Sequence, residues 1–175
     1  MRPNVFEYAR GAPAWRVLAA AHHARCLADP ELNHPFDRDD LHPQHVERLA
    51  AYWAEVFGGP PTYSTHYSNH GQMLHLHAGN GVMSDLGRRF VECFALAADD
   101  AGLPADPLFR AVLHAYMEWA VAEVLSYPER EDVPYGAAIR AGPGTGCRPR
   151  RPPSRGSYRR PRRRSPPAPR TYGMP

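Results

Sequence analysis

Apolar residues recur at spacings of three and four along much of the chain, and turn signals separate the periodic stretches. A first helix is predicted over residues 15–28, and it stops at the Asp-Pro pair of residues 29–30. A second opens after the His-Pro pair of residues 42–43 and runs to Phe57, before two glycines and two prolines. Such spacings place apolar side chains on one helix face, so both stretches are expected to pack against a core.

Further along, the same periodicity predicts three more helices. Ser84 is a plausible N-cap for a helix that ends at residues 99–102, and Asp106 caps another that closes at Pro128. A short helix is expected over residues 72–79, ending at glycine. No stretch shows the sustained alternation of a sheet strand, so the fold is predicted to be all-α.

The stretch MLHLHAGNG contains two histidines, His75 and His77, two positions apart. On a strand such a pair could share a metal, because alternate residues face the same way. On the predicted helix the two side chains lie about 200° apart and cannot share a ligand. One is therefore expected to face the core and the other solvent. Taken singly, a histidine beside a core is usually structural, and the same interpretation holds for His22, His23 and His45.

Charge divides the chain into two unlike parts. There is no lysine, and residues 141–175 hold ten arginines and no acidic residue. Residues 1–140 hold 11 arginines against 18 acidic residues, a net charge of −7. Proline, glycine and arginine without apolar periodicity cannot bury enough surface to fold alone. We therefore predict a folded domain over residues 1–135 and a disordered tail over residues 136–175.

The tail has three interpretations. It can be a solvated disordered segment, which is the simplest. Its arginine runs, interleaved with Tyr158 and Tyr172, could instead bind the phosphate backbone of a nucleic acid through counterion release and stacking. The absence of acidic residues beside abundant arginine, proline and glycine also fits a shifted reading frame in a GC-rich gene.

Cysteine usage and hydropathy indicate the compartment. Cys26, Cys93 and Cys147 are odd in number and widely spaced, with no CxxC motif, which fits a reducing compartment. No apolar run approaches the roughly 18 residues of a membrane span, and residues 1–14 lack the apolar core of a signal peptide. A cytoplasmic protein of bacterial type, with no membrane partner, is expected.

Several segments together resemble the truncated haemoglobins, specifically their second group, over roughly residues 6–128. They are FEYARGAPAWRVLAAAHHARCLADPELNHPF (6–36), QHVERLAAYWAEVFGGPPTYS (44–64), LHAGNG (76–81) and DDAGLPADPLFRAVLHAYMEWA (99–120). The resemblance implies a shortened globin whose helices stack two over two around haem b. It also implies that His77, which precedes Ala78-Gly79, ligates the iron, with His75 as its neighbour on the solvent side.

The resemblance implies further haem contacts. Phe36 occupies the position where globins place an aromatic ring against haem, and His45 occupies that of a distal polar residue. Leu49 and Trp53 face the same space, where they are either haem contacts or ordinary core residues. Phe90, counted on from His77, also falls in the haem site.

On the distal side the sequence departs from the family pattern. A tyrosine that donates to bound ligand is replaced by His23, and a tryptophan with the same role is replaced by Phe90. Losing a donor to a partly charged ligand weakens its retention by about 1.5–3 kcal/mol. His23 and His45 could replace the donors, as imidazoles expected to titrate near physiological pH, or His45 could itself bind the iron.

Three functions remain open at this point. The first is a haem globin that binds oxygen or another diatomic ligand for storage, transport or sensing. The second is a haem redox enzyme, a nitric oxide dioxygenase or peroxidase-like protein, which would need a separate reductase because no flavin or nicotinamide motif is present. The third is a haem-free helical domain whose tail binds nucleic acid.

Overall fold

The computed structural model describes residues 4–33, 36, 41–78, 84–134, 136 and 139. Across these residues every regular element is helical, which confirms the all-α prediction. The elements are α1 (Val5–Tyr8), α2 (Ala12–Ala28), α3 (His45–Val56), α4 (Thr62–His66), α5 (His70–His77), α6 (Ser84–Asp100), α7 (Pro107–Leu125) and the 3-10 turn η1 (Arg130–Asp132). None of the helices described is long and apolar enough to cross a membrane.

Two helices begin earlier than predicted because local caps extend them. α2 starts at Ala12, after Gly11 with a φ of 76°, a left-handed conformation that favours glycine, and it carries a proline in its first turn. α5 starts at His70 because the side chain of Asn69 accepts a hydrogen bond from the backbone N–H of Gln72 at 2.9 Å. The glycine predicted to close this helix, Gly79, lies outside the described residues.

Other predicted boundaries hold to within a residue or two. The side chain of Asp106 accepts from the Phe109 N–H at 2.8 Å, so it caps α7 as expected. Ser84, expected to cap α6, is instead its first residue. The short helices α1 and α4 were not predicted, although a capping box between Asn4 and Glu7 marks the start of α1.

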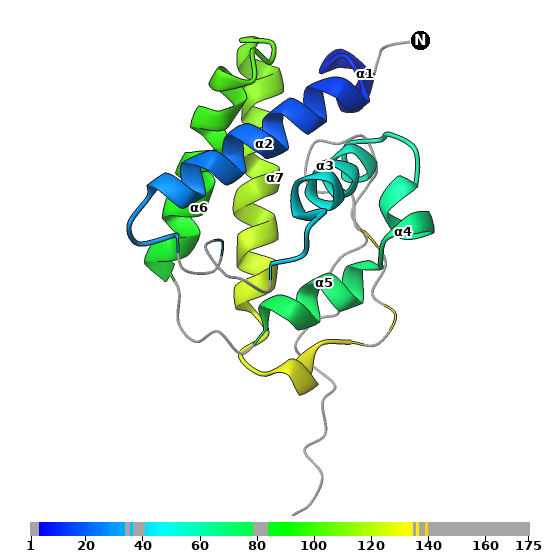
Figure 1. The fold of residues 1–175 in the computed structure, drawn as a ribbon, viewed down its shortest axis with the longest axis vertical. Coiled ribbons are helices and arrows are strands. Elements are labelled where there is room, and N and C mark those ends of the chain that lie inside the picture. Colours follow the sequence, from blue (N-terminus) through cyan, green and yellow to red (C-terminus); the bar gives the residue numbers. More distant parts are fainter. Residues whose placement is uncertain are drawn as a thin grey trace, which may run out of the picture.

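The four long helices form two packed pairs (Figure 1). α2 packs against α3, its partner in one pair, and also runs across α6. α6 in turn packs against α7. This is the two-over-two arrangement predicted from the sequence. The shorter α5 lies near the lower end of α7 in Figure 1, where its Leu74 belongs to the same apolar cluster as Val124.

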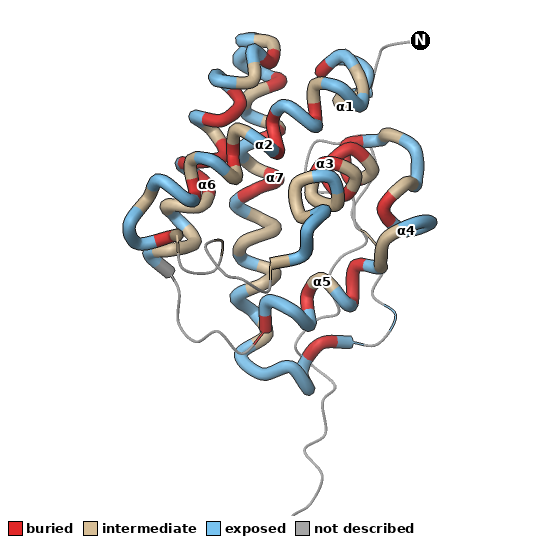
Figure 2. The backbone as a smooth tube through the Cα atoms, viewed as in Figure 1, coloured by how far each residue is buried: buried red, intermediate tan, exposed pale blue. Residues whose placement is uncertain are grey.

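Buried and exposed residues alternate along the helices, as amphipathic faces require (Figure 2). The main core is built on large aromatic rings. Trp15 of α2 stacks on Phe57 with ring centroids 4.8 Å apart, and Tyr116 of α7 meets Phe57 edge-on at 4.8 Å. All three side chains are almost completely buried. Their packing fixes the position of α2 relative to α7, so the backbone that carries the site is rigid.

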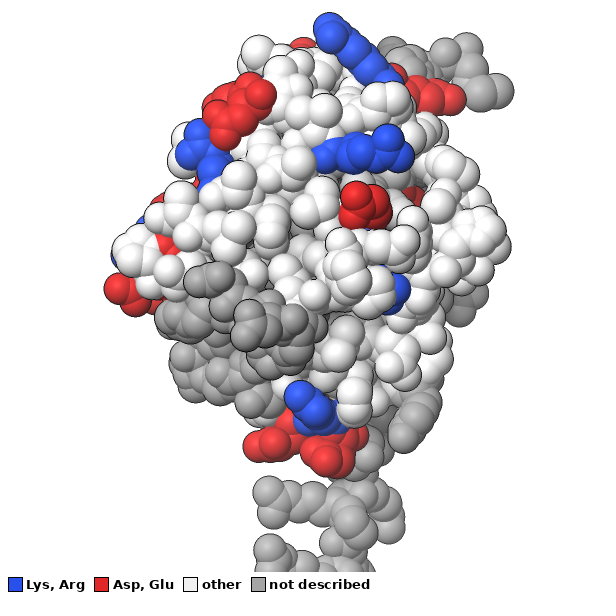
Figure 3. All heavy atoms as spheres, viewed as in Figure 1, with Lys and Arg blue, Asp and Glu red and all other residues white. Residues whose placement is uncertain are grey.

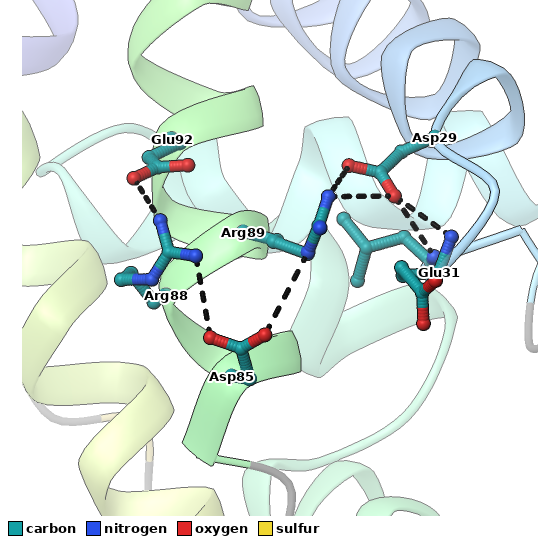
Figure 4. A network of polar contacts seen from close by, with 7 residues as sticks. Asp29, Glu31, Asp85, Arg88, Arg89 and Glu92 are labelled. Carbon is teal, nitrogen blue, oxygen red and sulfur yellow. Dashed lines mark hydrogen bonds and ion pairs between the residues drawn. The ribbon is translucent and has the colours of Figure 1, made fainter.

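An ion-pair network holds the segment that follows α2 against α6 (Figure 4). The carboxylate of Asp29 accepts from the backbone N–H of Glu31 at 2.9 Å and from the guanidinium of Arg89 at 3.0 Å. These contacts lower the pKa of Asp29, the backbone N–H contributing most. On α6, Arg88 pairs with Asp85 and Glu92. Because Asp29 caps the end of α2, the network keeps the chain leading to Phe36 next to α6.

Candidate functional site

Three side chains that the sequence analysis assigned to the haem site meet in the structure. The imidazoles of His23 on α2 and His45 at the start of α3 have centroids 5.2 Å apart. The ring of Phe36 lies edge-on to both, 5.8 Å from His23 and 6.0 Å from His45. Residues from two helices and the segment between them thus form one aromatic and imidazole cluster.

Two nitrogens of this cluster have unusual surroundings. Nδ1 of His23 and Nε2 of His45 are buried and have no hydrogen-bond partner within the described part of the chain. Buried polar atoms are nearly always paired, since an unpaired one costs about 1–3 kcal/mol. A small polar ligand or a water molecule would satisfy them. The pair therefore points to a binding site rather than to a sealed core.

The two distal imidazoles are neutral at physiological pH. Burial lowers the pKa of His45 to about 4, with smaller contributions from the positive charges of His23 and His77. Burial also lowers the pKa of His23. This differs from the expectation that both titrate near physiological pH, because the sequence does not reveal how far packing removes them from water. A neutral imidazole offers one N–H donor and one acceptor.

His77 is the last residue of α5, and its charge contributes to the lowered pKa of His45. His77 is exposed, and its Nδ1–H donates to the carbonyl oxygen of Met73 at 2.7 Å. A carbonyl can only accept, so Nδ1 carries a hydrogen, and this bond fixes the orientation of the ring. Histidines that ligate haem iron commonly do so through one ring nitrogen while the other donates to such a partner.

The buried face of α5 shows where the two histidines of MLHLHAGNG lie. The buried residues of the helix are His70, Gly71 and Leu74, and Ala78 just beyond it is also buried. His75 and His77 emerge on opposite flanks of this buried face, and both are exposed. The expectation that one of them faces the core is therefore wrong. His75 lies on the solvent side as predicted.

The core-facing histidine of α5 is His70, which the sequence analysis did not single out. Its spacing of four and eight from Leu74 and Ala78 was the available signal. Near His77, the apolar side chain of Leu76 is 70% exposed. An exposed leucine next to a histidine is typical of a site that binds a large apolar cofactor.

The remaining predicted haem contacts divide into two kinds. Phe90 is partly buried and stacks on Phe36 with centroids 6.4 Å apart and an interplanar angle of 17°. Leu49 is partly buried against the main core. Trp53 is 3% exposed and meets Phe94 edge-on at 4.9 Å, so the structure favours its interpretation as a core residue.

His22, interpreted from the sequence as a structural histidine, is fully buried. Its ring lies 4.4 Å from that of Phe90 and 5.2 Å from that of Trp53, edge-on to both. Its Nε2 is 3.4 Å from the Phe90 carbonyl oxygen. Burial lowers the pKa of His22 to about 4, so its side chain is neutral. It packs against Phe90, which in turn stacks on Phe36.

The residues present fit a haem group. Among the described residues no three histidine, cysteine or acidic side chains converge in a way that could hold a metal ion. The backbone-oriented imidazole of His77, the exposed apolar side chain next to it in sequence, and the unpaired nitrogens of His23 and His45 instead fit a haem with one protein ligand. His77 would hold the iron, and Phe36 and Phe90 would contact the porphyrin.

Comparison with known proteins agrees with this arrangement. The haemoglobin of Chloroflexus aurantiacus is 27% identical, with a TM-score of 0.61 over 71% of this chain and 98% of that chain. The haemoglobin of Thermobifida fusca is 28% identical, with a TM-score of 0.58 over 73% and 100%. The group II truncated haemoglobin of Bacillus anthracis shares the fold at 18% identity, with a TM-score of 0.62 over 74% and 95%.

A search of curated protein sequences found no match. The model of the family described as bacterial-like globin, in contrast, matches residues 4–128. This match includes all the long helices, the cluster of His23, Phe36 and His45, and His77. Because it spans well over half of the sequence, the chain belongs to the bacterial-like globin family and is a haem-binding globin.

Proposed function

We propose that this globin binds dioxygen or another diatomic ligand at an iron held by His77. The observation that carries the proposal is the hydrogen bond from His77 Nδ1 to the Met73 carbonyl, 2.7 Å long, at the end of α5. With Nδ1 held by the backbone, Nε2 is the ring nitrogen that would ligate iron on one side of the cofactor. His23 and His45 then line the opposite side, where the ligand enters.

Haem supplies the iron centre to which the ligand bonds, and the protein sets how long the ligand stays. A dioxygen ligand carries partial negative charge, which N–H groups of His23 and His45 would stabilise. Phe90 has no donor to add. Ligand retention is therefore proposed to depend on two neutral imidazoles, which supports reversible binding with rapid release over tight storage.

The assignment of His77 can be tested with a matched pair of variants. Full-length wild type, His77→Ala and His75→Ala are purified, titrated with haemin and examined by absorption and resonance Raman spectroscopy. His75→Ala is expected to keep the Soret band and the iron–imidazole signature, and His77→Ala to lose that signature. Loss in His75→Ala, with the signature kept in His77→Ala, would overturn the assignment.

A redox function is the second candidate, and the paired imidazoles are the observation that favours it. Neutral His23 and His45, with centroids 5.2 Å apart, could take up and return a proton during reduction of peroxide or turnover of nitric oxide. Either reaction needs electrons, and a separate reductase would have to supply them. Measured turnover with peroxide and a reducing dye distinguishes this function from simple ligand binding.

Binding of nucleic acid through the tail stays a prediction, because residues 141–175 lie outside the described residues. The folded part gives it little support. On the face shown in Figure 3, arginine side chains lie beside acidic ones instead of forming one basic patch. Over the described part of the chain, arginines form ion pairs with acidic residues: Arg25–Asp100, Arg88–Asp85, Arg88–Glu92, Arg89–Asp29 and Arg110–Asp99. The cytoplasmic location inferred from cysteine usage is likewise still a prediction.

A further inference from the structure

A buried histidine outside the haem site joins three helices. His70 is the first residue of α5 and is 2% exposed. The hydroxyl of Tyr52 on α3 lies 2.9 Å from its Nδ1, and a carboxylate oxygen of Glu123 on α7 lies 3.2 Å from its Nε2. The Tyr52 and His70 rings are almost parallel, 5° apart in orientation. This Tyr52–His70–Glu123 chain is the polar contact of α5 with both helix pairs.

The partners determine the hydrogen-bond directions. An ionised carboxylate can only accept, so Nε2 of His70 carries the hydrogen and donates to Glu123. Nδ1 pairs with the hydroxyl of Tyr52, which can donate or accept. Both ring nitrogens thus have a partner, and the buried ring keeps these bonds away from bulk water. Removing either partner would leave a buried polar atom unpaired.

Apolar packing and His70 together hold α5. The end of the helix is fixed by an apolar cluster of Leu74, Ala78 and Val133. The first turn buries His70 and Gly71, and the partly buried Met73 packs against the main core. Because His70 adds directional hydrogen bonds to this packing, the orientation of α5 depends on it as well.

That orientation matters because α5 also carries His77. His77 lies seven positions, nearly two helical turns, after His70. His77 is fixed to the backbone of the same helix through Met73, so a tilt of α5 moves its ring as a unit. Iron–imidazole bonds are sensitive to ligand orientation, and partners outside the ligand set tune them.

We propose that His70 is a positioning residue, which sets the orientation and strength of the iron–His77 bond by hydrogen-bonding α5 to Tyr52 and Glu123. This rests on the proposed function, since it requires His77 to be the iron ligand. His70 itself contacts neither the iron nor the ligand. Its effect passes through the backbone of α5.

The test uses haem-loaded full-length protein and single changes in the chain of hydrogen bonds. Tyr52→Phe removes the bond to α3, and Glu123→Ala removes the bond to α7, whereas Glu123→Gln keeps an acceptor for Nε2–H. Tyr63→Phe is the matched control, because Tyr63 packs edge-on against Tyr52 at 5.1 Å and its hydroxyl has no hydrogen bond among the described residues. The readouts are the iron–histidine stretching band of the ferrous protein and the rate of haem transfer to a scavenger.

Tyr52→Phe and Glu123→Ala are expected to shift or broaden the iron–histidine band. Each should also speed haem loss by about tenfold, the factor that corresponds to roughly 1.4 kcal/mol, the size of one hydrogen bond. Glu123→Gln should restore the wild-type band, and Tyr63→Phe should not change it. A merely destabilising change would lower the melting temperature without moving the band.

The outcomes separate the two proposals. If wild type shows the iron–histidine band, and His77→Ala abolishes it, but Tyr52→Phe and Glu123→Ala leave band and haem loss unchanged, the role of His70 is wrong and the proposed function stands. If Tyr63→Phe shifts the band as much as Tyr52→Phe does, ring packing and not the hydrogen bond is responsible, and the proposal is overturned. A wild type without the band overturns both.

Discussion

The imidazoles of His23 and His45 lie with their centroids 5.2 Å apart, one from α2 and one from α3. Each has a buried nitrogen without a hydrogen-bond partner among the described residues. The pair thus offers hydrogen-bonding capacity to a bound ligand. Under the proposed function, these two neutral imidazoles take the place of the family's tyrosine and tryptophan donors.

Rapid oxygen release is the first consequence. With neutral imidazoles in place of hydroxyl and indole donors, wild type should release oxygen quickly. Phe90→Trp introduces an indole N–H beside Phe36 and His22, and it should slow release by about tenfold, the factor that corresponds to 1.4 kcal/mol. Stopped-flow measurement of oxygen dissociation checks this, with Phe90→Leu as a control that changes packing without adding a donor. Equal rates in all three proteins would contradict the account.

The distal histidines should also make ligand release depend on pH, but only in the acid range. Burial lowers the pKa of His45 to about 4 and that of His23 in the same direction, so both stay neutral at pH 7 and gain protons only as pH falls. Oxygen release should be constant between about pH 6.5 and 8 and change as pH falls toward 4, where His45 gains its proton.

His45→Leu and His23→Leu separate the contributions of the two rings. Each should reduce the acid-range change in stopped-flow traces, and His45→Leu has a second readout. If His45 binds the iron in the resting state, the variant converts a six-coordinate absorption spectrum into a five-coordinate one. A release rate that neither substitution alters at any pH would show that the imidazoles do not face the ligand.

Much of the fold was predictable because the long helices are specified locally. Apolar spacing and the caps at Asp106 and residues 29–30 mark their extent, so α2, α3, α6 and α7 were found within a few residues. α1 and α4 are too short for periodicity to show. Family resemblance, rather than pattern, indicated that Phe36 and Phe90, distant in sequence, belong to one site, and the structure places their rings 6.4 Å apart.

What the sequence could not reveal is burial that depends on tertiary packing. Nothing local distinguishes His22 from its neighbour His23. The ring of His22 is nevertheless buried among Trp53, Phe90 and Phe94, whereas that of His23 packs with Phe36 and His45. The histidines of α5 show the same limit. Attention to the His-x-His pair missed His70, whose partners come from helices far along the chain.

Acid should destabilise the fold through His22. Its pKa is about 4 when folded and about 6.5 when exposed in the unfolded chain, so the unfolded state binds the proton more readily. The contribution of neutral His22 to the free energy of unfolding is fully present above about pH 6.5 and is lost as pH falls through 4. A pKa difference of this size corresponds to a total loss of about 3 kcal/mol. Urea unfolding at pH 7 and pH 4.5 measures it.

His22→Leu puts an apolar side chain in place of the imidazole and so removes the titrating group. The difference in unfolding free energy between the two pH values should shrink in this variant. His75→Ala, a change at an exposed histidine, should leave the difference as in wild type. A His22→Leu protein as sensitive to acid as wild type would assign the effect to other groups.

Gly59 should tolerate no side chain. A Cβ at this position would lie 2.7 Å from the backbone oxygen of Ala54 and 2.7 Å from the ring of Phe6, closer than packed atoms approach. Gly59→Ala should therefore destabilise the protein by about 1–3 kcal/mol, as overpacking does. Thermal unfolding checks this against Gly87→Ala, where the clash is only with the flexible side chain of Val121 and the loss should be smaller. Equal stabilities would contradict the packing seen after α3.

The end of the folded domain can be located by chain length. The family match stops at residue 128, and a boundary near residue 135 was predicted from the change of charge. Two apolar side chains beyond residue 128 pack on the fold, however. Val133 is 9% exposed in the cluster that holds Leu74 of α5, and Ile139 packs against the main core. Both contribute buried surface, worth about 1.5–3 kcal/mol for a fully buried side chain.

Chains ending at residues 128, 135 and 140 should therefore differ in order. The chain ending at 140 is expected to match the full-length protein in haem affinity and melting temperature. The chain ending at 135 should show a slightly lower melting temperature. The chain ending at 128 should show the lowest melting temperature and release haem fastest, because α5 has lost its contact with Val133. Any affinity for nucleic acid should be absent from all three and fall steeply with salt in the full chain. A chain ending at 128 that equals full length in both measurements would show that Val133 and Ile139 do not support the haem site.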